Sequence, residues 1–134
     1  MRYVDGYVLP VSKRKLKAYL RMARMGEEMW RRHGAIDYKE CIGDDLSATW
    51  GPGFSRMMKL KPGETVVFSY IVFKSRAHRD RVNAKVMKEM TKAGMPKEMP
   101  FDMKRMTYGG FNVAVGAERK TRRTAARAAK GRPR

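Results

Sequence analysis

The segment Thr65–Phe73, TVVFSYIVF, decides the fold of this chain. Side chains of an extended strand point alternately to opposite faces. One face therefore carries Val66, Phe68, Tyr70 and Val72, and the other carries Val67, Ser69, Ile71 and Phe73. Because apolar residues lie on both faces, the pattern predicts a strand that is covered on both sides. The segment is too short to cross a bilayer as a helix.

The segments around this strand alternate between strand and helix periodicity. Strands are predicted at 3–10, 35–42 and 108–115, the first of them ended by Pro10. One helix is predicted at 13–33, with Ser12 as its N-cap and Gly34 as its end, and a second from the capping residue Ser75 to about residue 93. A long loop at 43–64 joins two of the strands and contains Trp50. The order βαββαβ predicts an α+β fold of the ferredoxin-like type.

The two predicted helices can cover only one face of a sheet with four strands. The strand at 65–73 is apolar on both faces, so the second face requires another cover. A second copy of the same sheet supplies a matching apolar surface. The sequence therefore predicts a homodimer with its sheets packed face to face.

Charge and composition divide the chain near Gly116. The chain has 31 Lys and Arg residues against 13 Asp and Glu residues, a net charge of +18. Residues 117–134, AERKTRRTAARAAKGRPR, contain no large apolar side chain and are predicted to be a basic, disordered tail after a single domain at 1–116. The N-terminus has no apolar signal segment and the chain has one cysteine, which predicts a reduced, cytoplasmic protein that does not enter the membrane.

The basic residues provide one hypothesis for function, nonspecific binding of RNA or DNA. The candidate residues are Lys13, Arg14 and Lys15 at the start of the first helix and Arg119, Lys120, Arg122, Arg123 and Arg127 in the tail. Cations at a helix N-terminus oppose the helix dipole, so they either accompany a bound anion or are tolerated surface charges. The tail has no aromatic residue, so base stacking is not indicated there.

A second hypothesis is a small-molecule site between the sheet and the helices. Its candidate residues are Glu40, Trp50, Tyr70, His78 and Asn83. Glu40 shares a strand face with Tyr38, and an exposed edge position is the favoured interpretation. The alternative is a carboxylate that points into an apolar space, where burial raises its pKa. His78 begins the buried stripe of its helix, and a packed histidine at the edge of the core is the favoured interpretation. The alternative is a catalytic or ligand-binding role.

Nothing in the sequence identifies a cofactor. The chain lacks nucleophile-elbow, P-loop and dinucleotide-binding patterns, and His33, Cys41 and His78 do not match zinc-ligand spacing. We therefore predict no cofactor and no metal. Tyr108-Gly109-Gly110-Phe111 indicates a close backbone contact in a strand rather than a phosphate-binding loop.

Three blocks of sequence carry a resemblance to a known family. They are YVDGYVLPV near the start, KLKPGETVVFSYIVFKSRAHRDRVNAKVM in the middle and MPFDMKRMTYGGF near the end. Together they resemble the YbaA-like family, which is defined by a domain of unknown function, over about residues 1–115. The resemblance implies a dimeric α/β barrel and no established reaction. The wider superfamily includes cofactor-independent monooxygenases, which leaves a monooxygenase-like enzyme as a further alternative; fold alone does not decide it.

Overall fold

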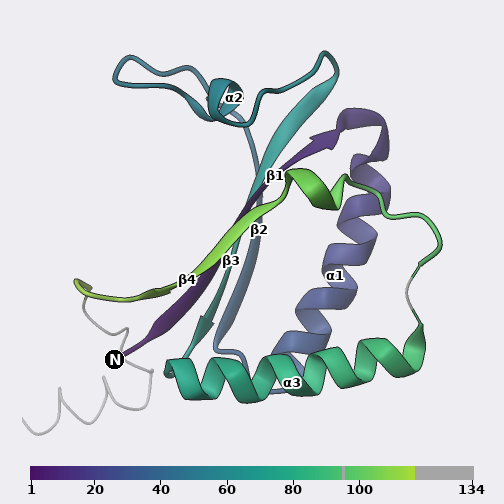
Figure 1. Ribbon diagram of the computed structural model, residues 1–134, viewed down its shortest axis with the longest axis vertical. Helices are drawn as coiled ribbons and strands as arrows, with labels where there is room; N and C mark the ends of the chain where they lie inside the picture. The colour runs from purple at the N-terminus through teal and green to yellow at the C-terminus, as the bar shows by residue number, and fades with distance from the viewer. Residues whose placement is uncertain (95, 117–134) are drawn as a thin grey trace, which may run out of the picture.

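A computed structural model describes residues 1–94 and 96–116 of the chain. Its elements in chain order are β1 (Tyr3–Ser12), η1 (Lys13–Lys15), α1 (Leu16–Arg32), β2 (Asp37–Ile42), α2 (Phe54–Met57), β3 (Glu64–Phe73), α3 (Arg76–Ala93), η2 (Met103–Arg105) and β4 (Thr107–Asn112). The short α2 lies within the long loop between β2 and β3 (Figure 1). The predicted order of strands and long helices is therefore confirmed.

The strands form one antiparallel sheet in the order β2-β3-β1-β4. This order and the two long helices are those of a ferredoxin-like α+β fold, as the sequence predicts. The helices α1 and α3 both lie on one side of the sheet, whereas the loop that contains α2 projects on the other side (Figure 1). The side that carries α1 and α3 is called the helix-facing side below, and the other is the open face.

Strand register assigns each side chain to one of these two sides. Residues paired across neighbouring strands share a face, so Asp5, Ile71 and Tyr38 form one row and Tyr7, Ser69 and Glu40 form the next. Both rows lie on the helix-facing side, because their side chains bond residues of α1 and α3. The alternation of Tyr38 and Glu40 with Lys39 in β2 is thus as predicted.

The core between sheet and helices consists of two hydrophobic clusters. One includes Phe73, Val82 and Val86, and the other includes Leu9, Tyr19 and Val67. Tyr7 packs against both clusters, so it lies where they meet. The polar residues described in the next subsection are concentrated near this junction.

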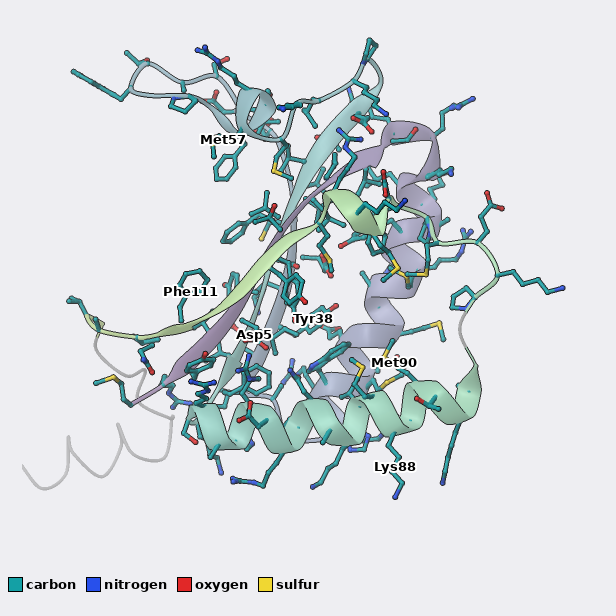
Figure 2. All side chains as sticks on the ribbon, viewed as in Figure 1. Asp5, Tyr38, Met57, Lys88, Met90 and Phe111 are labelled. Carbon is teal, nitrogen blue, oxygen red and sulfur yellow. The ribbon has the colours of Figure 1, made fainter. Side chains whose placement is uncertain are left out.

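The open face is only partly covered within one chain. Phe68, in the central strand β3, is 43% exposed, and Phe111, in the edge strand β4, is 61% exposed. Figure 2 shows Phe111 and Met57 on this side, away from α1 and α3. The expectation that both faces of β3 are buried is therefore not met by the single chain, and the predicted dimer stays a prediction.

The turns and helix ends correct some local predictions. The Ser12 side chain makes no capping hydrogen bond, because the chain first forms the 3-10 turn η1, whose Lys13 amide donates to the Gly63 carbonyl at 2.8 Å. Ser75 does cap α3, accepting from the His78 amide at 3.1 Å. The first strand, β1, does not end at Pro10 as predicted but continues to Ser12, and the last strand, β4, ends at Asn112, earlier than predicted. In the described residues no helix is long and apolar enough to span a membrane.

Gly110 confirms the predicted close contact in the last strand. A Cβ atom built on Gly110 would lie 2.2 Å from the Tyr3 hydroxyl oxygen, closer than real side chains approach. A Cβ atom on the neighbouring Gly109 would fit without a clash, because the nearest atom, on Phe111, would be 3.9 Å away. The predicted tail, 117–134, lies outside the described residues.

Candidate functional site

The most distinctive group on the helix-facing side is the carboxylate of Glu40. Tyr19 of α1 donates its hydroxyl to Oε2 at 2.9 Å, and Tyr38 of β2 donates to Oε1 at 2.9 Å. Tyr19 belongs to one core cluster and Tyr38 to the other, so Glu40 bridges them. Within the described residues, no Lys or Arg forms an ion pair with Glu40.

Gly26 of α1 makes this arrangement possible. A Cβ atom on Gly26 would lie 2.9 Å from the Tyr38 hydroxyl oxygen. Any side chain at position 26 would therefore displace the hydroxyl that donates to Glu40. The glycine interrupts a helix that would otherwise favour alanine, which costs helix stability. Gly26 therefore lowers the intrinsic stability of α1 but leaves space for the Tyr38 hydroxyl that donates to Glu40.

Glu40 belongs to a polar row that crosses the sheet through Ser69, Tyr7 and Tyr108. The Tyr7 and Tyr108 rings stack with centroids 5.9 Å apart. Within the described residues, the Ser69 and Tyr7 hydroxyls make no hydrogen bond, although Ser69 is only 6% exposed. Every fully buried side-chain oxygen there has a partner, so these two oxygens still contact solvent. We call these four residues the Glu40 row.

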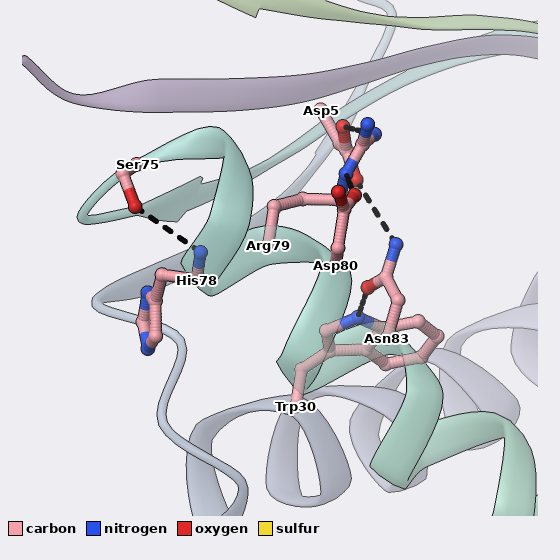
Figure 3. Close-up of polar contacts among 7 residues, drawn as sticks. All are labelled: Asp5, Trp30, Ser75, His78, Arg79, Asp80 and Asn83. Atoms are coloured by element: carbon pink, nitrogen blue, oxygen red, sulfur yellow. Dashed lines mark hydrogen bonds and ion pairs between the residues drawn. The ribbon is translucent and has the colours of Figure 1, made fainter.

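A second polar network lies beside the row, between β1 and α3 (Figure 3). Asp5, which is 4% exposed, accepts from the Arg79 Nη1 at 2.7 Å. Asn83 donates to Asp5 at 3.4 Å and accepts from the Trp30 Nε1 at 3.0 Å. The Arg79 Nε also donates to Asp80 at 2.8 Å. This network joins β1, α1 and α3.

The electrostatics of the two carboxylates differ from those of surface acids. Burial raises the pKa of Glu40, and the two tyrosine hydrogen bonds only partly oppose that shift. Burial also raises the pKa of Asp5, and the Arg79 charge partly opposes it. For Tyr7, burial and then the negative charge of Asp5 raise the pKa to about 12. Ionisation of these three acids is thus less favourable than at the surface, which is typical of functional sites but also occurs in structural networks.

His78 lies at the edge of the core, as the favoured interpretation expected. Its Nδ1 accepts from the Lys74 amide at 3.0 Å, and its ring packs edge-on against Phe73 with centroids 6.0 Å apart. Burial, and then the charges of Lys74 and neighbouring cations, lower the pKa of His78. In Figure 3 its ring points away from Asp5 and Asn83. These contacts are those of a histidine packed at the edge of the core.

The structure does not bring all five predicted ligand-binding residues together. Glu40 and Asn83 lie on the helix-facing side, whereas Tyr70 pairs in register with Gly6 and Lys39 and so belongs to the open face. Trp50 is 91% exposed in the loop between β2 and β3. The sequence prediction placed Tyr70 on the wrong side of the sheet. The alternation in β3 separates its residues into two faces, but it does not show which face the helices cover.

Two surface hollows occur away from the Glu40 row. One, of about 350 Å³, lies between α1 and the segment before η2 and is lined by residues such as Ala18, Met22 and Pro100. The other, of about 440 Å³, lies in the loop at Pro52 and Met57. Neither has a convergent set of buried polar groups, so neither resembles a ligand site.

The basic candidates fall into two groups. Lys13, Arg14 and Lys15 are exposed on η1, and Lys15 lies 4.0 Å from Glu98. Arg119, Lys120, Arg122, Arg123 and Arg127 lie outside the described residues. Nucleic-acid binding therefore stays a prediction from the charge of the sequence.

Sequence reasoning missed several residues of the site. They are Asp5, Tyr7, Tyr19, Trp30, Tyr38, Ser69, Arg79 and Tyr108. Asp5 gave the clearest available signal, because it is a lone acid on the strand face that Tyr3, Tyr7 and Leu9 share. Among residues 1–94 and 96–116, no cluster of three or more His, Cys, Asp or Glu residues is placed to hold a metal ion.

Comparison with known proteins gives a family but no reaction. The model of a family described as protein of unknown function (DUF1428) matches residues 2–103. The proteins named Uncharacterized protein YbaA from Escherichia coli strain K12 and from Shigella flexneri are each 38% identical to this chain over 115 residues, covering 86% of this chain and 98% of theirs. A solved structure, the de novo designed protein Foldit4, aligns with a TM-score of 0.40 and 12% identity over 83% of this chain and 94% of its own, a likeness too weak to bear on function.

Proposed function

Since this chain belongs to the DUF1428 family, whose description names no activity, we propose a function from the site itself: the protein binds a small molecule at the Glu40 row. The observation that supports this proposal is the Glu40 carboxylate, which two tyrosine hydroxyls hold and which no Lys or Arg of the described residues neutralises. Burying a carboxylate with no cation beside it costs stability, and the two tyrosine hydrogen bonds only partly offset that cost. A ligand that donates to Glu40 would add a further partner.

The chemistry that the site offers is hydrogen bonding and proton transfer. Each Glu40 oxygen accepts one tyrosine bond and can accept another. Burial raises the pKa of Glu40 above its usual range, so this carboxylate is a stronger proton acceptor than a surface glutamate. Binding is the function for which the contacts argue directly.

A thermal-shift screen of small metabolites tests the proposal. We expect at least one compound to raise the melting temperature of the wild-type chain and of Glu28→Gln, but not that of Glu40→Gln. Glu28 is the matched control because it is an exposed glutamate of α1 that undergoes the same chemical change. If no compound in a broad screen separates Glu40→Gln from the control, the proposed function is wrong.

We also propose that two copies associate through the open face. Phe68 and Phe111 remain substantially exposed there, and Lys39 is the only basic residue that the four strands place on that face. Two chains of net charge +18 repel each other, so their contact should use the surface with the fewest cations. A nucleic acid, in contrast, would require cations on that face.

The oligomeric state tests this second proposal. Sedimentation velocity of the full chain at micromolar concentration should show a dimer, and Phe68→Glu should shift it to a monomer with an unchanged circular dichroism spectrum. Lys88→Glu is the control, because Lys88 extends from α3 away from the sheet (Figure 2). A monomeric wild type, or a dimer that survives Phe68→Glu, would contradict the proposed interface.

A further inference from the structure

The charge of the Glu40 row restricts the ligands that it can hold. Glu40 contributes a negative charge, and the adjacent Asp5 is already paired with Arg79. Although the whole chain carries +18, no Lys or Arg among the described residues neutralises Glu40. An anionic group placed beside Glu40 would therefore be repelled in surroundings that screen charge poorly.

The hydroxyl groups of the row add a requirement for polar groups on the ligand. Ser69 lies between Glu40 and Tyr7 in the register, and the hydroxyls of Ser69 and Tyr7 are unpartnered within the described residues. Hydroxyls donate as well as accept, whereas ionised Glu40 only accepts. A ligand should therefore place a hydrogen-bond donor at the Glu40 end, because Glu40 can only accept, whereas the hydroxyls can either donate or accept.

The other end of the row is aromatic. Tyr7 and Tyr108 stack with an interplanar angle of 19°, and Tyr108 is 69% exposed. Stacked rings present a flat face on which another planar ring can pack. Adjacent strands lie about 4.8 Å apart, so the backbones of Glu40 and Tyr7, two strands apart, are separated by roughly 10 Å. One ring or two fused rings with a polar substituent match that span.

Taking the proposed function as its basis, we infer that the Glu40 row selects a planar compound of one or two rings that presents a hydroxyl or amino donor to Glu40 and carries no anionic group. The donor occupies the free acceptor capacity of the carboxylate, and the ring packs toward Tyr7 and Tyr108. Selection against anions comes from the unneutralised charge of Glu40. The ligand class thus follows from two observations, the charge of Glu40 and the aromatic surface of Tyr7 and Tyr108, together with the ordinary spacing of strands.

Two naphthalene compounds of equal ring size test this inference. 2-Naphthol is a neutral donor at pH 7, whereas 2-naphthoate is an anion. Calorimetric titration of the full chain should give a dissociation constant for 2-naphthol about tenfold lower, or better, than for 2-naphthoate. Amide chemical-shift changes should locate binding at β1, β2 and α1.

The variants identify which groups cause the preference. Glu40→Gln should weaken naphthol binding and reduce the difference between the two compounds to about threefold or less, because the charge is gone. Tyr108→Ala should weaken both compounds similarly, because it removes ring contact without altering charge. Glu28→Gln should leave both titrations unchanged.

Three results would overturn the inferred ligand class. The first is naphthoate binding at the row as tightly as naphthol, and the second is a preference that survives Glu40→Gln. The third is no measurable binding of either compound at millimolar concentration. The metabolite screen then distinguishes the two proposals, because a non-aromatic compound that depends on Glu40 would preserve the site and reject only this ligand class.

Discussion

Replacing Asp5 by alanine tests whether the network between β1 and α3 holds the fold together. Removing one partner of a buried ion pair leaves the other charge without compensation and typically costs about 3–5 kcal/mol. Asp5 is almost fully buried, but Arg79 retains its contact with Asp80 and its side chain is 19% exposed. We therefore expect a loss near the lower end, about 3 kcal/mol in the free energy of unfolding, or about 10 °C in melting temperature.

Urea denaturation followed by circular dichroism measures this loss. The control is Asp37→Ala, which removes a carboxylate from β2 whose partner, Lys39, is a surface cation; little change is expected there. A double variant, Asp5→Leu with Arg79→Met, should recover most of the loss, because apolar residues of similar volume need no charge compensation. An Asp5→Ala chain that unfolds within about 0.5 kcal/mol of wild type would refute the reasoning, since that is the range of ordinary surface substitutions.

The remaining predictions concern strand β4, the helix cap of α3 and the titration of Glu40. Gly110→Ala should destabilise by about 1–3 kcal/mol because its Cβ meets the Tyr3 hydroxyl, whereas Gly109→Ala should be close to neutral in the same denaturation assay. Ser75→Ala should cost about 1 kcal/mol, since it removes the bond to the His78 amide; an unchanged urea midpoint would contradict this role. Burial raises the pKa of Glu40 in the folded state above its pKa in the unfolded chain. Protonation of Glu40 therefore stabilises the fold fully at a pH below the unfolded pKa, and this stabilisation is lost as the pH rises through the folded pKa. Wild type should therefore lose stability relative to Glu40→Gln as pH increases from about 4.5 towards 7, and melting curves that stay parallel across this range would show that Glu40 is not buried in solution.

The candidate site could be predicted from the sequence only in part. The alternation of β2 correctly placed Glu40 with Tyr38, because strand geometry fixes which residues share a face. The helical spacing of α3 likewise placed His78 at the start of the buried stripe. The partners of Glu40 and Asp5 were missed, since Tyr19 is 21 residues from Glu40 and Arg79 is 74 residues from Asp5. Local periodicity contains no information about such contacts.

The sequence by itself determined the order of elements and the family. Strand and helix periodicities, the cap at Ser75 and the apolar strand at 65–73 are local properties, and each acts within a few residues. Only the tertiary structure decided which face of β3 the helices cover, and therefore that Ser69 belongs with Glu40 while Tyr70 lies opposite. The physical reason is that a strand that is apolar on both sides fits either orientation locally, so packing of distant helices makes the choice.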